Sequence, residues 1–125
     1  MESREVLVIG SAPDALVQSV STLYTKQIVM TGERYRHIVE RHPELIGCEH
    51  LIIEAIRDPD AVHANDQDPN ILLLYRTNKG RATVRIALWI SDDQIRSNSV
   101  HSARLARAKE QERGVRRGKV LWKRG

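Results

Sequence analysis

Residues 71–90, ILLLYRTNKGRATVRIALWI, determine the class of fold that we expect for this chain. Ile71 to Thr77 and Arg81 to Ile90 predict two β-strands, because apolar side chains alternate in the second and a tight Asn-Lys-Gly turn separates them. One face of this hairpin is apolar. The other face offers Arg85 and Trp89.

More short strands are expected on both sides of the hairpin. They are Glu5 to Gly10, Lys26 to Met30, Ala61 to Asn65 and Gln94 to His101. Ser102 to Arg113 is predicted to be helical by propensity. Gly114 to Gly125 is predicted to be a basic tail, in which Lys119 to Lys123 could pair with a sheet edge.

Two helices are expected before the hairpin. Thr31 has the side chain of an N-cap, and Pro43 disfavours helical geometry at His42, so the first helix should end there. The second runs from about Cys48 to Arg57 and stops at Asp58-Pro59-Asp60. Helices followed by antiparallel strands predict an α+β fold.

Length and charge set further limits. The 125 residues are enough for a single domain, residues 1–125, and no apolar run approaches the roughly 20 residues that span a bilayer. The single cysteine, Cys48, rules out an internal disulfide and favours a cytoplasmic protein, whether made there or delivered from another cell or a phage. Residues 91–125 carry 10 basic and 4 acidic side chains, so a polyanion is the expected partner. The alternative is a solvated helix and tail.

The densest candidate for chemistry is Glu33 to Glu44, ERYRHIVERHPE. His37 and Arg41 are four residues apart and share a helix face, and His42 stands at the helix end, where the dipole favours the imidazolium. Histidine can take or give a proton near neutral pH. The alternatives are a solvated surface residue for His37 and a packed helix-end residue for His42.

The strands add basic groups beside aromatic rings. Guanidinium groups match phosphate oxygens, and aromatic faces can stack unpaired bases. Ser99, in a polar cluster near the last strand, could hydrogen-bond a phosphate. The alternative is a sheet face that is polar only for solubility. The strand candidates are Tyr75, Arg76, Lys79, Arg85 and Trp89.

No metal or other cofactor is expected. His37 and His42 are five residues apart, whereas helical zinc sites use a spacing of four. The remaining histidines are scattered, and neither a glycine-rich nucleotide loop nor a Gly-x-Ser-x-Gly motif is present.

The string from Val29 to Glu44, with Ile56 to Val62 and the strands of residues 71–90, resembles the phage-associated nuclease-like domains of the barnase–EndoU–colicin–RelE group. Those domains share a T-x-E-R…H-I…R-H-P-E helix, a second helix that ends in D/N-P-D-x-V, and an antiparallel sheet. The resemblance implies two N-terminal helices packed on a four-stranded antiparallel sheet, followed by a C-terminal helix and a basic tail. Residues 25–105 would form the nuclease-like core, 1–24 an N-terminal strand and turn extension, and 106–125 the helix end and tail.

The implied activity is a metal-independent endoribonuclease of toxin or effector type, in which the 2′-hydroxyl attacks the neighbouring phosphate and leaves a 2′,3′-cyclic phosphate. RNA is the implied partner, and an acidic immunity or antitoxin protein would cover the basic face. The expected catalytic residues are His42, Arg41, Arg85, Ser99 and His101, the last of which no family motif carries. The expected substrate-binding residues are His37, Tyr75, Arg76, Lys79 and Trp89.

Two other functions fit the same residues. One is a nucleic-acid-binding module without catalysis, and the other is a phage or mobile-element accessory domain that contacts only protein. The absence of an obvious carboxylate on the sheet face favours histidine and arginine chemistry but does not separate an enzyme from a binding module.

Overall fold

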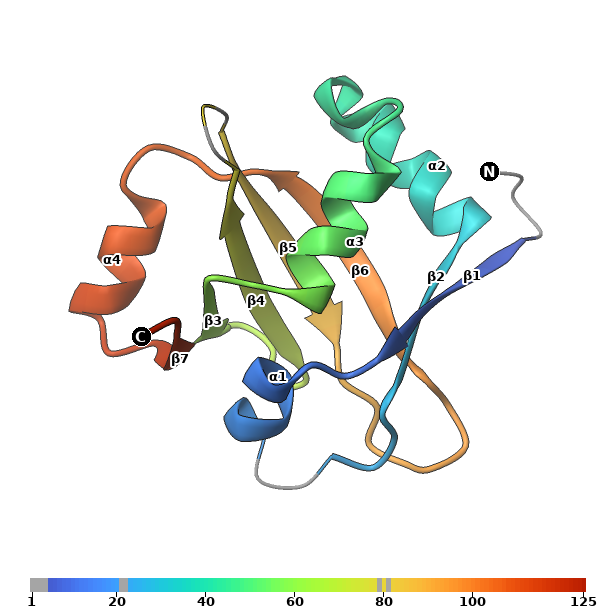
Figure 1. The fold of residues 1–125 in the computed structure, drawn as a ribbon, viewed down its shortest axis with the longest axis horizontal. Helices are drawn as coiled ribbons and strands as arrows, with labels where there is room; N and C mark the ends of the chain where they lie inside the picture. The colour runs from blue at the N-terminus through green and yellow to red at the C-terminus, as the bar shows by residue number, and fades with distance from the viewer. Residues whose placement is uncertain (1–4, 21–22, 79, 81) are drawn as a thin grey trace.

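The computed structural model describes residues 5–20, 23–78, 80 and 82–125. Across these residues a seven-stranded mixed sheet has the order β1-β2-β6-β5-β4-β3-β7, and four α-helices accompany it (Figure 1). The strands are β1 (Val6–Ser11), β2 (Gln27–Thr31), β3 (Ala61–Ala64), β4 (Ile71–Thr77), β5 (Thr83–Trp89), β6 (Asn98–Leu105) and β7 (Val120–Lys123). The helices are α1 (Asp14–Ser19), α2 (Gly32–Arg41), α3 (Glu49–Arg57) and α4 (Glu110–Arg116), with a 3-10 turn, η1 (Pro43–Leu45).

The expected architecture of two N-terminal helices on a four-stranded antiparallel sheet is wrong. β1, β2 and β7 also belong to the sheet, and β2 pairs with β6 in parallel. The segment expected to be a helix from Ser102 continues β6 as far as Leu105, and α4 begins only at Glu110. The pairing of β2 with β6 joins segments far apart in the chain, so no local pattern in the sequence shows it.

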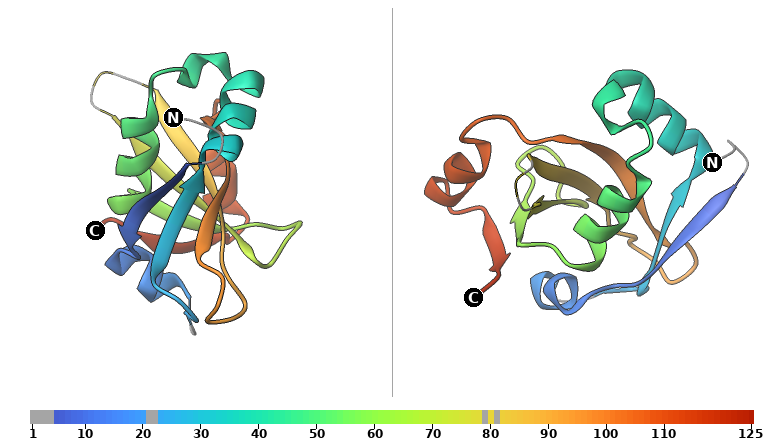
Figure 2. Two further views of the ribbon diagram at one scale, coloured as in Figure 1. Left: turned by 90° about the vertical axis from the view of Figure 1, so that its right-hand side faces the viewer. Right: turned by 45° about the horizontal axis from the view of Figure 1, so that its top comes forward.

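The sheet curves around α3, which lies against its concave face (Figure 2). α3 packs on both β1 and β4, which are far apart in the strand order, so the sheet has to bend around the helix. α1 follows β1 at one edge but packs on β3 and β7 at the other edge. The core between them is aliphatic: Ile52, Ala55 and Ile56 of α3 are buried with residues such as Leu74 and Ile86 from the sheet.

The two expected N-terminal helices are confirmed as α2 and α3. The hydroxyl of Thr31 accepts a hydrogen bond from the Arg34 N–H at 3.0 Å and caps α2, as the sequence predicts. Tyr35 and Ile38 are the buried large side chains of α2, and the helix ends before Pro43. In the described part of the chain, no helix has the length and apolar character needed to cross a lipid bilayer.

Candidate active site

The candidate site lies where β2 and β6 separate. The two strands pair only at Ile28 opposite Asn98 and Val29 opposite Ser99. Beyond these pairs β2 leads into α2, whereas β6 continues beside β5 (Figure 1). α2 packs on β6 and on β2. The separation leaves a cleft between a helix on one side and two strands on the other.

This cleft has a volume of about 790 Å³ and is strongly basic. Five arginines and three histidines line it, with one carboxylate among the described lining residues. Fixed positive charge in a cleft favours an anionic ligand. The residues are Thr31, Glu33, Arg34, His37, Ile38, Arg41 and His42 from the side of α2, and Arg85, His101, Ser102, Arg104 and Arg107 from the side of the strands.

On the helix side, glutamates flank the histidines. His37 Nε2 lies 3.8 Å from Glu33 Oε1, and its Nδ1 lies 4.0 Å from Glu40 Oε2. His42 Nδ1 lies 3.7 Å from Glu44 Oε1, and its side chain is 31% exposed. These separations suit ion pairs to protonated rings but are too long for hydrogen bonds. Both rings are therefore accessible to a ligand in the cleft.

On the strand side, a β-bulge in β6 sets the direction of the histidine. Ala87 of β5 faces Ser102, and Leu88 faces Val100, so the register passes over His101. A bulge of this kind interrupts the alternation of side chains along a strand. As a result Val100 and Ala103 are both buried in the core, whereas His101 and Ser102 both line the cleft.

Arg85 occupies the floor of the cleft on β5. Its Nη2 donates a long hydrogen bond of 3.5 Å to the Ser102 hydroxyl, and its buried Nε has no hydrogen-bond partner among the described residues. Burial lowers the pKa of Arg85, and the positive charge of neighbouring Arg104 lowers it further. A charged group with unused donors is more stable with an anion beside it.

Arg104 is held by a carboxylate of α4. Its Nη1 donates to Glu110 Oε1 at 2.6 Å, and the hydroxyl of Tyr75 donates to Glu110 Oε2 at 2.9 Å. Burial alone would raise the pKa of Glu110, but the bonds from Arg104, the Arg107 N–H and Tyr75 hold it below its usual range. Burial and the neighbouring carboxylate raise the pKa of Tyr75. This network fixes Arg104 at the edge of the cleft.

The structure brings five of the ten expected site residues into the cleft. They are His37, Arg41, His42, Arg85 and His101. Tyr75 is buried beneath Glu110, so its ring cannot stack on a base. Lys79 lies outside the described residues.

The other three expected residues lie elsewhere on the sheet. Ser99 sits between Trp89 of β5 and Val29 of β2. Trp89 has the guanidinium of Arg96 over its ring, 5.2 Å from the centroid. The three expected residues that do not line the cleft are Ser99, Trp89 and Arg76.

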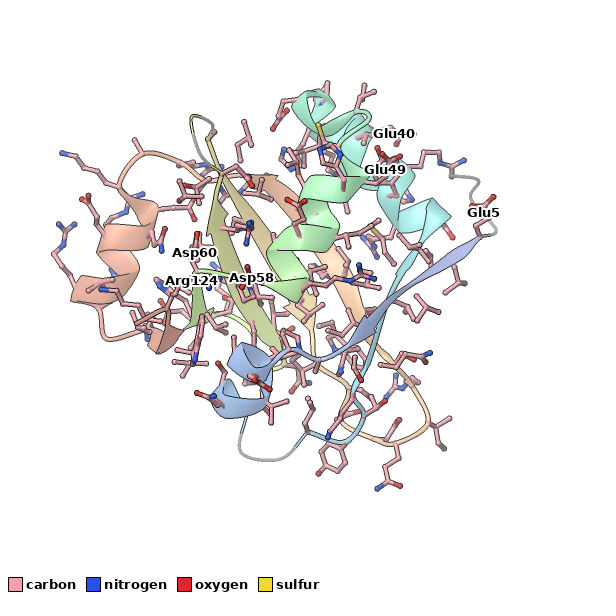
Figure 3. All side chains as sticks on the ribbon, in the orientation of Figure 1. Glu5, Glu40, Glu49, Asp58, Asp60 and Arg124 are labelled. Carbon is pink, nitrogen blue, oxygen red and sulfur yellow. The ribbon has the colours of Figure 1, made fainter. Side chains whose placement is uncertain are left out.

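Arg76 binds Asp58, the residue that caps the C-terminal end of α3. It pairs with Val84 in the register, on the face of β5 that carries the apolar core, and its Nη1 donates to Asp58 Oδ2 at 2.9 Å. Arg124, just after β7, also binds Asp58 and Asp60 (Figure 3). These bonds hold the pKa of Asp58 below its usual range. Arg76 therefore has a structural partner.

Sequence reasoning missed four residues of this region: Arg34, Arg104, Arg107 and Glu110. Arg34 lies in the quoted helix motif and was visible. The other three fall in the segment from Ser102 to Arg113, whose helical propensity hides a strand, a loop and the start of α4. Arg104 lies opposite Arg85 because the final strand extends past His101, which the helical propensity of this segment does not indicate.

No group of three or more His, Cys, Asp or Glu side chains within the described ranges is arranged to hold a metal ion. Comparisons of the chain with protein-family models, with curated proteins and with solved structures found no match. The cleft's own residues therefore carry the functional argument.

Proposed function

We propose that the chain is an endoribonuclease that binds RNA in the cleft between α2 and the β5–β6 strands and cleaves it by attack of the 2′-hydroxyl. The observation that carries the proposal is the convergence of three histidines with five arginines in one cleft. These groups come from two walls, α2 and the strands, so they can contact a bound phosphate from two sides.

The arginines supply phosphate binding. Arg85 offers a buried Nε without a partner among the described residues, and Arg41 lies across the cleft on α2. Forked guanidinium donors match the oxygens of a phosphodiester. The attack places extra negative charge on the phosphorus oxygens, and donors already oriented toward them lower the barrier.

The histidines supply the proton transfers. His42 and His101 come from opposite walls of the cleft. One imidazole takes the proton of the 2′-hydroxyl as the 2′-oxygen bonds to phosphorus. The other gives a proton to the 5′-oxygen as the bond between phosphorus and that oxygen breaks. The products are a 2′,3′-cyclic phosphate and a free 5′-hydroxyl, and no water is consumed.

The test is incubation of purified protein with single-stranded and structured RNA in excess EDTA, followed by analysis of the fragment ends. We expect cyclic-phosphate ends from the wild type and a loss of about 100-fold or more in rate for His42→Ala and for His101→Ala. A substrate with a single 2′-deoxy position should resist cleavage at that position.

His50→Ala is the matched control, because His50 is an exposed histidine of α3 that does not line the cleft. It should cleave RNA at the wild-type rate. Intact RNA with folded wild-type protein would refute the enzyme and leave nucleic-acid binding as the function of the cleft. Equal activity in all three histidine variants would point to a contaminating ribonuclease.

A further inference from the structure

The basic surface of the cleft continues past its floor. A second hollow of about 440 Å³ lies between the sheet, the turn after β3 and α4, and it shares Arg85, Arg104 and Arg107 with the cleft. The shared arginines belong to β5, to β6 and to the loop before α4. The two hollows are therefore parts of one surface that crosses the strands.

α4 supplies the far side of this surface. Arg113 of α4 and Arg117, the residue that caps the C-terminal end of the helix, are four residues apart, and both are exposed and line the second hollow. Neither makes an ion pair or a side-chain hydrogen bond with any residue that the structure describes. Their charge is available to a ligand.

The other charges of the second hollow are largely used within the protein. Lys119 is paired with Asp66, and Glu110 is paired with Arg104. The remaining positive charge therefore comes from Arg113 and Arg117 at one end and from Arg85 and Arg107 at the junction with the cleft. The cations thus fall into separate groups along two adjoining hollows, which suits the successive phosphates of a polymer better than one small anion.

The shape of the surface favours a single strand. α2 borders it on one side and α4 on the other, with the strands between them, as Figure 1 and the right-hand view of Figure 2 show. A single RNA strand can follow a floor between two helices. An RNA duplex is wider and keeps its bases stacked inside it, so it fits such a floor less well.

We propose that RNA binds as a single strand across both hollows, with the cleaved phosphate at Arg85 and neighbouring phosphates at Arg113 and Arg117. We call the joined surface, from His42 through Arg85 to Arg117, the basic track. The inference rests on the proposed function for the choice of RNA, but the track is tested by binding alone.

The experiment measures fluorescence anisotropy with labelled 2′-O-methyl RNA, which the proposed reaction cannot cleave because its 2′-oxygen is blocked. A dinucleotide and a twelve-nucleotide strand are compared. Arg113→Ala/Arg117→Ala should weaken binding of the long strand about ten-fold or more and leave the dinucleotide unaffected. Loss of two phosphate contacts should also reduce the slope of log affinity against log salt by about 1.4.

Arg116→Ala is the matched control, because it removes the same charge from the same helix and Arg116 lines neither hollow. It should bind both strands nearly as the wild type does. The track is overturned if Arg116→Ala weakens binding of the long strand as much as Arg113→Ala or Arg117→Ala does. It is also overturned if the dinucleotide and the long strand bind with equal affinity, or if an RNA duplex binds more tightly than the single strand.

The two proposals fail separately. Length-dependent binding that depends on Arg113 and Arg117, without cleavage of natural RNA, supports the track and refutes the ribonuclease. Cleavage that depends on His42, with unchanged long-strand binding in the double α4 variant, supports the ribonuclease and overturns the track.

Discussion

Gly114 of α4 is required by a neighbour rather than by its own backbone. A Cβ at this position would overlap Nδ1 of His63 and lie 2.8 Å from its Cε1, and His63 is only 2% exposed, so its ring has little room to move aside. Gly114→Ala, which by helix propensity should stabilise an exposed helix by about 1 kcal/mol, is therefore expected to destabilise the protein by about 1–3 kcal/mol. Thermal or urea unfolding measures the sign.

The double variant His63→Ala/Gly114→Ala is the control for that prediction. Removal of the ring leaves room for the new methyl group, so the double variant should lose less free energy of unfolding than the sum of the two single losses. Simple additivity would show that the contact between the ring and the helix is not the cause.

Asn98 is a second residue on which neighbouring segments of the chain depend. It is fully buried, its Oδ1 accepts from the Ser91 N–H at 2.8 Å, and its Nδ2 donates to the Thr25 carbonyl at 2.8 Å. Asn98→Ala leaves both backbone groups without these bonds and should cost about 2–4 kcal/mol in denaturant unfolding. Asn98→Asp places a carboxylate in the same buried position, with one oxygen against the Thr25 carbonyl, so at neutral pH its cost should be at least as large; a smaller cost would contradict this account.

α4 is attached to the sheet mainly through polar groups. None of its residues is buried, and its contacts include the Glu110 carboxylate on Arg104 and Tyr75 and the Gly114 backbone against His63. Two titratable groups, His63 and Glu110, therefore control how firmly α4 is held. Acid protonates both of them and removes the states that stabilise these contacts.

The sign follows from the direction of each pKa shift. Burial lowers the pKa of His63 from its usual 6.5, with the charge of Glu110 acting the other way, so below about pH 6.5 the unfolded chain takes up a proton that the folded chain does not. The free energy of unfolding falls as the pH drops through this range. The lowered pKa of Glu110 adds a further loss below its usual 4.5.

His63→Gln is expected to flatten the dependence of stability on pH between about 6.5 and 5. One proton contributes a slope of at most about 1.4 kcal/mol per pH unit, and the variant should lose up to that amount of slope. Urea unfolding at a series of pH values measures it. His50→Gln, on exposed α3 surface, should keep the wild-type slope; an unchanged slope in His63→Gln would place the titration elsewhere.

Elements with local signals were predictable from the sequence. Thr31 and Pro43 mark the ends of α2. The alternation in Arg81 to Ile90 and the tight turn before it predict the hairpin, and its first strand, β4, has the expected bounds Ile71–Thr77. The segment after His101 was not predictable in this way, because its helical propensity is overridden by pairing with β5 up to Val84 opposite Leu105. β7 had only a weak signal, since its strand is short and pairs with β3 from a distant part of the chain.

The whole molecule owes its candidate site to long-range pairing. The helix wall with His37, Arg41 and His42 was readable from the sequence as a motif, but its position opposite Arg85 and His101 depends on the parallel contact of β2 with β6. Arg76 shows the limit of motif reasoning, because the register of β4 with β5 sends it to Asp58 at the far end of α3. Two residues adjacent in sequence, Tyr75 and Arg76, thus face opposite sides of the sheet.

The bulge at His101 has one more consequence, which concerns the alternation of inward and outward side chains along β6. Val100 and Ala103 are buried three residues apart, whereas an unbroken strand buries every second residue. Deletion of residue 101 would restore an uninterrupted frame, with Val100 and Ala103 inward and Ser102 and Arg104 still toward the arginines. We therefore expect the variant that lacks His101 to keep its sheet and to lose a histidine of the cleft. This variant would separate the requirements for folding of β6 from those for the chemistry of the cleft.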